Sequence, residues 1–387
     1  MERHFDSGEI AAFATGQLPR ERGRALVAHL LRGCRSCQAG SSALWRSREA
    51  VPDDAYDAAF DQVLPTEGGE PVEVLLDRAW ELRHEDPAEM RRVARQAVLR
   101  AEVQDPPGGT DLQCQAWAAY GNACRIAGDF GEAQEALDRA AGLHARGTGD
   151  PLLQARLYEF QASLESARRH YDRALTALDA AYAIYVQQGE RHMAGRALIS
   201  KGLHAGYAGR SREAFRFTQN GLAMVDETRD PGLVLSAIHN QLWFLLESGR
   251  AREARTLLRV HRDRLATGET QRLDLLWLDA RIKAALRNEE GALADLEAVE
   301  QGFLATDRRA KAASVKLDQA ALHLALGDGA RGLALIRAAE ETLKEVGTSS
   351  DVLMALDFLR RTLAQREVSA QYVLRLANVV RRDQREA

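Results

Sequence analysis

A small residue followed twelve positions later by a second small residue recurs about every forty residues along most of this 387-residue chain. The downstream column reads Ala133, Ala174, Ala214, Ala254, Ala292 and Gly332. The upstream column reads Gly121, Ala162, Gly202, Leu242, Ala280 and Ala320, so only Leu242 is not small. Because small residues let two helix backbones approach closely, two columns in register predict a series of antiparallel helical hairpins.

The copy of this pattern near residue 120 is the most complete. It reads Trp117-x-x-Tyr120-Gly121-Asn122-Ala123, then Gly128-Asp129-Phe130, then Glu132-Ala133, Leu137 and Ala140. This order resembles the tetratricopeptide repeat (TPR) family. The resemblance implies an all-α fold, a TPR-type α-solenoid of about six to seven helical hairpins whose groove binds other polypeptides. The period exceeds the ~34 residues of the standard repeat, which predicts longer helices or longer loops.

Helix-boundary residues agree with the phase of the repeat. Asp150-Pro151 and Asp230-Pro231 are each typical of a helix start, because Asp caps free N–H groups and proline fits the first turn. Glycines at 128, 209, 249 and 327 lie between the two helices of a hairpin, where a positive φ is often needed. We therefore expect a solenoid over residues 72–345, followed over 346–387 by amphipathic helices that cap its end.

The first residues of the chain contain a pattern of metal ligands. Cys34 and Cys37 form a Cys-x-x-Cys pair, His29 precedes them by about one helical turn, and His4 is the best available fourth ligand. Zinc prefers four such nitrogen and sulfur ligands, so the pattern predicts one zinc ion. Two alternatives remain open, namely reduced cysteines that bind no metal and a thiol redox switch.

The surrounding residues resemble a second family. Glu9-Ile10-Ala11-Ala12-Phe13, Gly16-Gln17-Leu18-Pro19 and an arginine-rich segment lead to His29 and the two cysteines. This order is similar to the zinc-binding anti-sigma domain of bacteria, although four residues rather than three separate His29 from Cys34. The resemblance implies a helical domain over residues 1–48 that binds a sigma factor, with His4 as the more variable ligand. Residues 49–71 are rich in acidic residues, proline and glycine, which predicts a flexible linker.

The TPR resemblance also implies which side chains line the groove of the solenoid. The positions of the first helix of each repeat that face the groove carry Asn122, Arg125, Arg156, Glu159, Arg196, His239, Trp243, Trp277 and Arg281. Trp and Arg are enriched where binding energy is concentrated, so this set is the candidate partner-binding site. The alternative for each tryptophan is ordinary packing between neighbouring helices.

Composition limits the possible functions. The net charge of −4 argues against a general nucleic-acid-binding protein. No segment is long and apolar enough to span a membrane, and the first residues do not form a signal peptide, so we expect a cytoplasmic protein. Phosphate-binding loops and nucleophile motifs are missing, so we expect no enzymatic activity. The leading hypothesis is a regulator that binds a sigma factor and a second polypeptide. The alternative is a scaffold in a signalling or defence complex, in which the N-terminal domain is purely structural.

Overall fold

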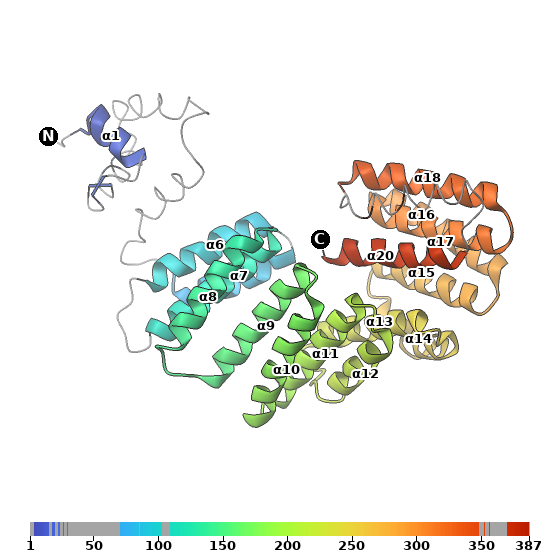
Figure 1. The fold of residues 1–387 in the computed structure, drawn as a ribbon, viewed down its shortest axis with the longest axis horizontal. Helices are drawn as coiled ribbons and strands as arrows, with labels where there is room; N and C mark the ends of the chain where they lie inside the picture. The colour runs from blue at the N-terminus through green and yellow to red at the C-terminus, as the bar shows by residue number, and fades with distance from the viewer. Residues whose placement is uncertain are drawn as a thin grey trace. The chain divides into compact units, whose positions relative to one another are not determined.

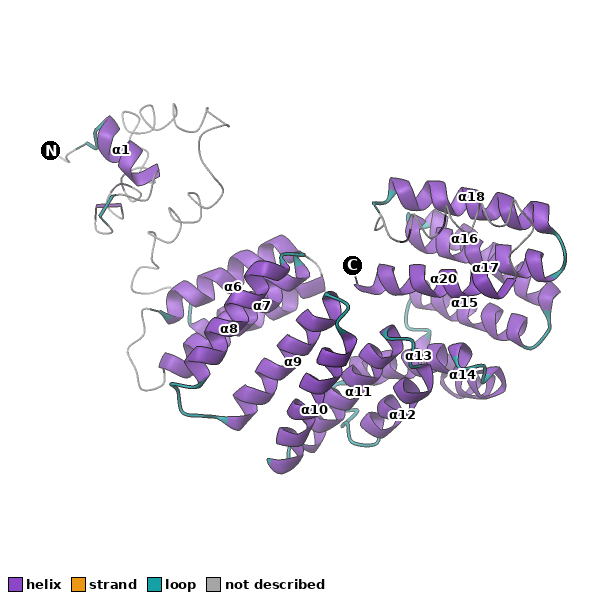
Figure 2. Ribbon diagram, in the orientation of Figure 1, coloured by secondary structure: helices purple, strands orange, loops and turns teal. Residues whose placement is uncertain are grey.

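The computed structural model describes residues 4–14, 18–19, 22–23, 26, 29, 70–84, 86–102, 109–347, 352, 356 and 370–386. All regular structure in these residues is helical, as Figure 2 shows. The described residues form two compact units, which lie within residues 1–150 and 151–387. No helix in the described residues is long and apolar enough to cross a membrane.

In the described residues, the first unit contains one short N-terminal helix and two helical pairs. Its helices are α1 Ser7–Ala14, α5 Val72–Glu81, α6 Pro87–Ala101, α7 Gly109–Ile126 and α8 Phe130–His144. A short 3-10 helix, Leu82–His84, follows α5. Near the N-terminus a small core is formed by Phe5, Ile10, Phe13, Leu18 and Leu26. All five are apolar residues within the predicted N-terminal domain, whose boundaries stay a prediction.

The described part of the second unit is a stack of five hairpins and a last helix (Figure 1). The hairpins are α9 Pro151–Ala167 with α10 Tyr171–Gln187, α11 Arg191–Tyr207 with α12 Ser211–Leu222, α13 Pro231–Glu247 with α14 Ala251–Leu265, α15 Glu269–Ala285 with α16 Glu289–Ala305, and α17 Arg309–Ala325 with α18 Gly329–Glu345. The final helix is α20, Ala370–Glu386. We call the first helix of each hairpin helix A and the second helix B. The predicted TPR-type α-solenoid is confirmed.

The small-residue columns mark where the two helices of a hairpin meet. Every residue of the downstream column is the fourth residue of a helix B, from Ala133 in α8 to Gly332 in α18. A Cβ added at Gly202 in α11 would lie 2.9 Å from the carbonyl oxygen of Ala214 in α12 and would also overlap Thr218. Because real Cβ atoms do not approach so closely, the glycine is what lets these two backbones touch. At the exception, Leu242, helices α13 and α14 pack less closely.

The turn inside each hairpin has the same backbone conformation. Four of these turns contain the predicted glycines, Gly128, Gly209, Gly249 and Gly327, and each has a positive φ. Arg169 and Arg287 occupy the same place in the other two hairpins, with φ values of 63° and 66°. A side chain at such a φ costs free energy, of the order of 1 kcal/mol, which glycine avoids. The positive φ is therefore a property of the repeat, and glycine is only its most frequent signal.

Candidate functional site

A cluster of charged side chains lies on the helix-A face of α9 and α11. Arg156 and Glu159 are one turn apart on α9, so they share one face of that helix. Arg196 lies one repeat later, on α11. Tyr185 reaches the cluster from α10 and donates its hydroxyl to Glu159 Oε2 at 3.0 Å. The structure thus brings together three of the predicted groove residues.

The carboxyl group of Glu159 has an unusual environment. Burial raises the pKa of Glu159 above its usual value, and the charges of Arg196 and Arg156 and the hydroxyl of Tyr185 only partly oppose this effect. Burial also raises the pKa of Tyr185, as does the nearby Glu159. A raised carboxyl pKa means that the folded protein holds this proton more tightly than water does. The two arginines therefore lie beside a carboxyl group whose charged form is disfavoured by burial.

Both arginines keep part of their hydrogen-bonding capacity. Arg156 is exposed. Arg196 is about one third exposed, and its Nη1 lies 3.4 Å from Oδ2 of Asp230, which is a long contact for an ion pair. Asp230 also uses Oδ1 to accept the N–H of Leu233 at the start of α13. Because a guanidinium has five N–H donors, both side chains can still bind an anionic group.

Asn122 and Arg125, the predicted groove residues of α7, contact each other. Arg125 donates from Nε and Nη2 to Oδ1 of Asn122, at 3.1 and 3.0 Å. Asn122 is buried, and burial lowers the pKa of Arg125, which remains charged. This pair is thus partly used in stabilising its own helix.

Trp243 is a core residue. It is 1% exposed and packs against Tyr207 and Phe244, with ring centroids 6.2 and 5.0 Å away. The sequence analysis placed it in the groove, but the side chain offers almost no surface to a partner. Its cluster lies between α11 and α13, because the aromatic residues of both helices meet there. His239, the other predicted residue of α13, is half-buried.

Trp277 and Arg281, the predicted groove residues of α15, face another part of the chain. Trp277 donates its indole Nε1–H to Oδ2 of Asp318 in α17, at 2.8 Å. Nη2 of Arg281 donates to Oδ1 of Asn378 in α20, at 3.3 Å. Arg381 of α20 donates to Asp318. The helix-A face of the last two hairpins is therefore covered by α20, which the sequence analysis did not foresee.

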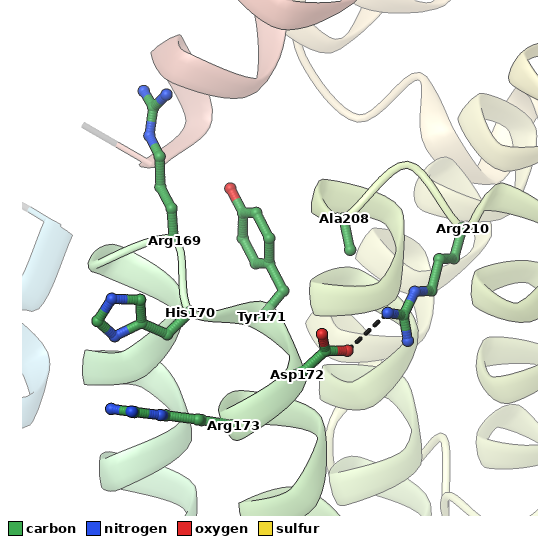
Figure 3. Close-up of a pocket in the computed structure, with 7 residues that line it drawn as sticks. All are labelled: Arg169, His170, Tyr171, Asp172, Arg173, Ala208 and Arg210. Atoms are coloured by element: carbon green, nitrogen blue, oxygen red, sulfur yellow. Dashed lines mark hydrogen bonds and ion pairs between the residues drawn. The ribbon is translucent and has the colours of Figure 1, made fainter.

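An open cavity of about 410 Å³ lies at the turns that precede α10 and α12 (Figure 3). Arg173 and His170 beside it approach the buried Glu165, at 3.7 and 3.0 Å. Arg210 forms an ion pair with Asp172 at 2.6 Å, which Figure 3 shows across the cavity. Arg169 also lines the cavity, so its three arginines outnumber the two carboxylates, those of Asp172 and Glu165, that lie close to them.

Two of the four predicted zinc ligands lie within the described residues. The imidazole rings of His4 and His29 have centroids 5.4 Å apart, and His29 is buried. This separation fits two rings that share one ion with Zn–N bonds of about 2.0–2.1 Å. Cys34 and Cys37 lie outside the described residues. Within the described part of the chain, no group of three or more potential ligands is found.

The sequence analysis missed two polar residues that contact predicted groove residues, namely Tyr185, which contacts Glu159, and Asp318, which contacts Trp277. Neither residue recurs from repeat to repeat. The equivalent positions of the other repeats carry no second tyrosine and no second aspartate, so the repeat pattern does not point to Tyr185 or Asp318. Asp318 had one local signal, because it is the single acidic residue of α17 and lies close to the buried Leu317 and Ala320. A lone acidic residue on a buried helix face requires a partner.

The comparisons with known proteins concern the fold. No family model matches the chain, and no curated protein matches it. A structure of NprR in complex with its cognate peptide NprX is 13% identical, with a TM-score of 0.55, over 79% of this chain and 88% of that one. Aspartyl phosphate phosphatase F from Bacillus subtilis is 10% identical, with a TM-score of 0.54, over 88% of this chain and 95% of that one.

A third structure is a Rap protein complexed with competence and sporulation factor. It is 12% identical, with a TM-score of 0.53, and the match covers 82% of this chain and 99% of the other. At such low identities the likeness concerns the backbone alone. This chain therefore shares with these proteins a TPR-like α-solenoid fold.

Proposed function

We propose that this protein is a non-enzymatic regulator that binds a polypeptide through the helix-A face of α9 and α11. The observation that carries the proposal is the placement of Arg156 and Arg196 around a carboxyl group whose pKa is raised. Two partly exposed arginines from successive repeats form a short row of donors. A carboxylate of the partner can accept two parallel hydrogen bonds from each guanidinium, so we propose an acidic segment as the recognised element.

Two of the similar structures support a polypeptide ligand. NprR is in complex with a peptide, and the Rap protein is complexed with competence and sporulation factor. The acidic character of the partner proposed here comes from the residues of this chain alone. The absence of a catalytic reaction is likewise part of the proposal, and its support is the lack of a nucleophile or phosphate-loop motif in the sequence.

Isothermal titration calorimetry of the full chain tests this proposal. The probe is a seven-residue peptide that alternates glutamate and alanine and has a free C-terminal carboxylate, and its control is the amidated glutamine version. Arg156→Gln and Arg196→Gln are each expected to weaken binding of the acidic peptide by about tenfold, the equivalent of about 1.4 kcal/mol. Glu159→Gln is expected to strengthen it, because one competing carboxyl is removed.

Arg212→Gln is the matched control, since Arg212 is an exposed arginine of helix B in α12. It should leave the affinity unchanged. If the double variant Arg156→Gln/Arg196→Gln binds the acidic peptide as tightly as the wild-type chain, the proposed face is wrong.

For residues 1–48 we propose one zinc ion, held by His4, His29, Cys34 and Cys37, in a domain that binds a sigma factor. The similarity of sequence order supports the sigma factor, and the short distance between the two imidazoles supports a shared ion. Zinc would act as a structural ion here, because a core this small gains stability from four ligands. Loss of zinc from the Cys34→Ser/Cys37→Ser chain, measured by elemental analysis, is the expected result.

Co-expression with sigma factors tests the partner. A complex that disappears when residues 1–50 are deleted supports the anti-sigma role. If no complex forms and promoter output stays the same, that role is excluded. Binding of the acidic peptide by the deleted chain would then favour the scaffold alternative.

A further inference from the structure

Helix α20 lies along α17 and covers it with an apolar face. Val373, Leu376, Ala377 and Val380 are buried in the same cluster as apolar residues of α17 and α18. They occupy positions i, i+3, i+4 and i+7, which is the apolar stripe of an amphipathic helix. Helix α20 lies beside α17 (Figure 1), and its Asn378 and Arg381 also contact Arg281 and Trp277 of α15.

One ion pair fixes the polar end of this contact. Nη1 of Arg381 in α20 donates to Oδ1 of Asp318 at 2.9 Å, and both side chains are almost completely buried, at 6% and 4% exposed. The guanidinium carbon of Arg381 also lies 5.8 Å from the centre of the Trp277 ring. The face formed by Trp277, Arg281 and Asp318 thus recognises an arginine by charge and by an aromatic ring.

The carboxylate of Asp318 keeps polar partners on α15 even without α20. Asp318 accepts a hydrogen bond from Trp277 and lies 3.8 Å from Nε of Arg281, so it retains two α15 partners when α20 moves away. Arg381 gains water when it leaves, and its Nε is buried without a hydrogen-bond partner within the described residues while α20 is docked. Departure of α20 therefore leaves no isolated buried charge, which is the usual obstacle to opening such a contact.

Two apolar side chains of α20 stay partly in water. Leu374 and Val379 lie on the two flanks of the buried stripe, at 43% and 40% exposed. Docking on α17 therefore does not bury every apolar residue of this helix.

We propose that α20 is an exchangeable occupant of the helix-A face of α15 and α17, and that a partner replaces it with an amphipathic helix of the same chemistry. This helix has apolar residues at i, i+3, i+4 and i+7 and an arginine at i+8, as α20 has from Val373 to Arg381. Exchange rather than simple release is required, because the apolar cluster on α17 and α18 would otherwise be exposed to water. While docked, α20 excludes the partner.

The test uses the full chain and a synthetic peptide of residues 370–387 as the incoming helix, with binding measured by calorimetry. The Arg381→Gln chain weakens the internal helix and leaves Asp318 intact, so it is expected to bind the peptide at least about tenfold more tightly than the wild-type chain does. The Asp318→Asn chain weakens the same contact but removes the arginine partner, so it should show no such gain. A peptide that carries R381Q should lose its affinity for the Arg381→Gln chain.

Arg375→Gln is the matched control, because Arg375 is an exposed arginine of α20. Its chain should bind the peptide as the wild-type chain does. If the Arg381→Gln chain shows no gain while its helicity equals that of the wild type, the proposal is overturned. A chain dimer that forms with rising concentration and dissociates when peptide is added would also overturn it, in favour of exchange between two copies.

Hydrogen exchange of the unmodified chain gives a second, independent test. Amides of α20 are expected to exchange at least about tenfold faster than the central amides of α17, because α20 opens without unfolding of the hairpin. Equal protection of the two helices would mean that α20 leaves only on global unfolding, and the proposal would be rejected. Neither test involves the face of α9 and α11, so the two proposals stand or fall separately.

Discussion

The helix-A face of α9 and α11 and that of α15 and α17 both carry an arginine–aspartate ion pair. The first face is open to water, whereas α20 covers the second. On the first, Arg196 faces Asp230 with both side chains about one third exposed. On the second, Arg381 faces Asp318 with both side chains nearly inaccessible to water, because α20 lies over them. The repeat fixes which helix face a residue occupies. Whether that residue meets a partner, water or the protein's own chain depends on a segment outside the repeat.

The largest expected effect tests the covered face. Asp318→Ala leaves Arg381 and Arg281 buried beside a lost carboxylate, so we expect the free energy of unfolding of this unit to fall by about 3–5 kcal/mol. Arg196→Gln on the open face should change it by about 1 kcal/mol or less. Urea unfolding followed by circular dichroism measures both. Equal losses from the two variants would mean that the cover provided by α20 has no energetic consequence.

A second substitution compares one hydrogen bond on each face. Trp277→Phe removes the donor to the buried carboxylate of Asp318, at an expected cost of about 1.5–3 kcal/mol. Tyr185→Phe removes the hydroxyl bound to Glu159, at about 0.5–1.5 kcal/mol. Thermal unfolding of the two chains should rank them in this order, and the reverse order would contradict the comparison.

The pH dependence of stability sharpens the description of the open face. Since the pKa of Glu159 is raised by burial, the folded chain keeps this proton to a higher pH than the unfolded chain, whose carboxyl has a pKa near its usual value of 4.5. Between the two values the folded state binds more protons, so the free energy of unfolding falls as pH rises. The contribution is fully present below the unfolded pKa and is lost through the folded pKa.

Glu159→Gln should remove this fall. Urea unfolding of the wild-type and variant chains between pH 4 and pH 8 is expected to show a difference that changes with pH. If the two stability curves run parallel over the whole range, Glu159 titrates normally and the electrostatic description of the open face is wrong.

The smallest effect is expected at an ion pair on the protein surface. Arg210 and Asp172 are 2.6 Å apart, but they are 42% and 81% exposed. Arg210→Gln should therefore lower stability by less than about 1 kcal/mol, and added salt should reduce the difference further. Unfolding midpoints at low and high salt measure this. A loss comparable to that of Asp318→Ala would show that exposure does not separate the two kinds of pair.

The sequence predicted the fold well because its determinants are local and repeated. The small residues at helix contacts and the turn glycines recur at a fixed interval, and each acts within one hairpin. Arg169 and Arg287 adopt the same positive φ as the turn glycines, but an arginine in the sequence does not indicate a positive φ. The repeat interval predicts that both positions lie in the turn of a hairpin, whereas the residue type does not.

The candidate site was predicted only in part, for a physical reason. Arg156, which the repeat pattern places on the groove face of α9, is exposed, and its role in binding stays a prediction. The burial of Trp243 depends on aromatic neighbours from another hairpin, and the cover over Trp277 depends on α20, about one hundred residues further along the chain. Such contacts have no local pattern, so only the three-dimensional structure reveals them.

The position of Trp277 has a practical consequence. Its indole N–H is bound to a buried carboxylate, and the guanidinium of Arg381 lies over its ring. Movement of the last helix changes the polarity around this ring and its access to water. The intrinsic emission of Trp277, and its quenching by acrylamide, therefore provide an optical sensor that needs no added dye, with the phenylalanine variant as the spectroscopic blank.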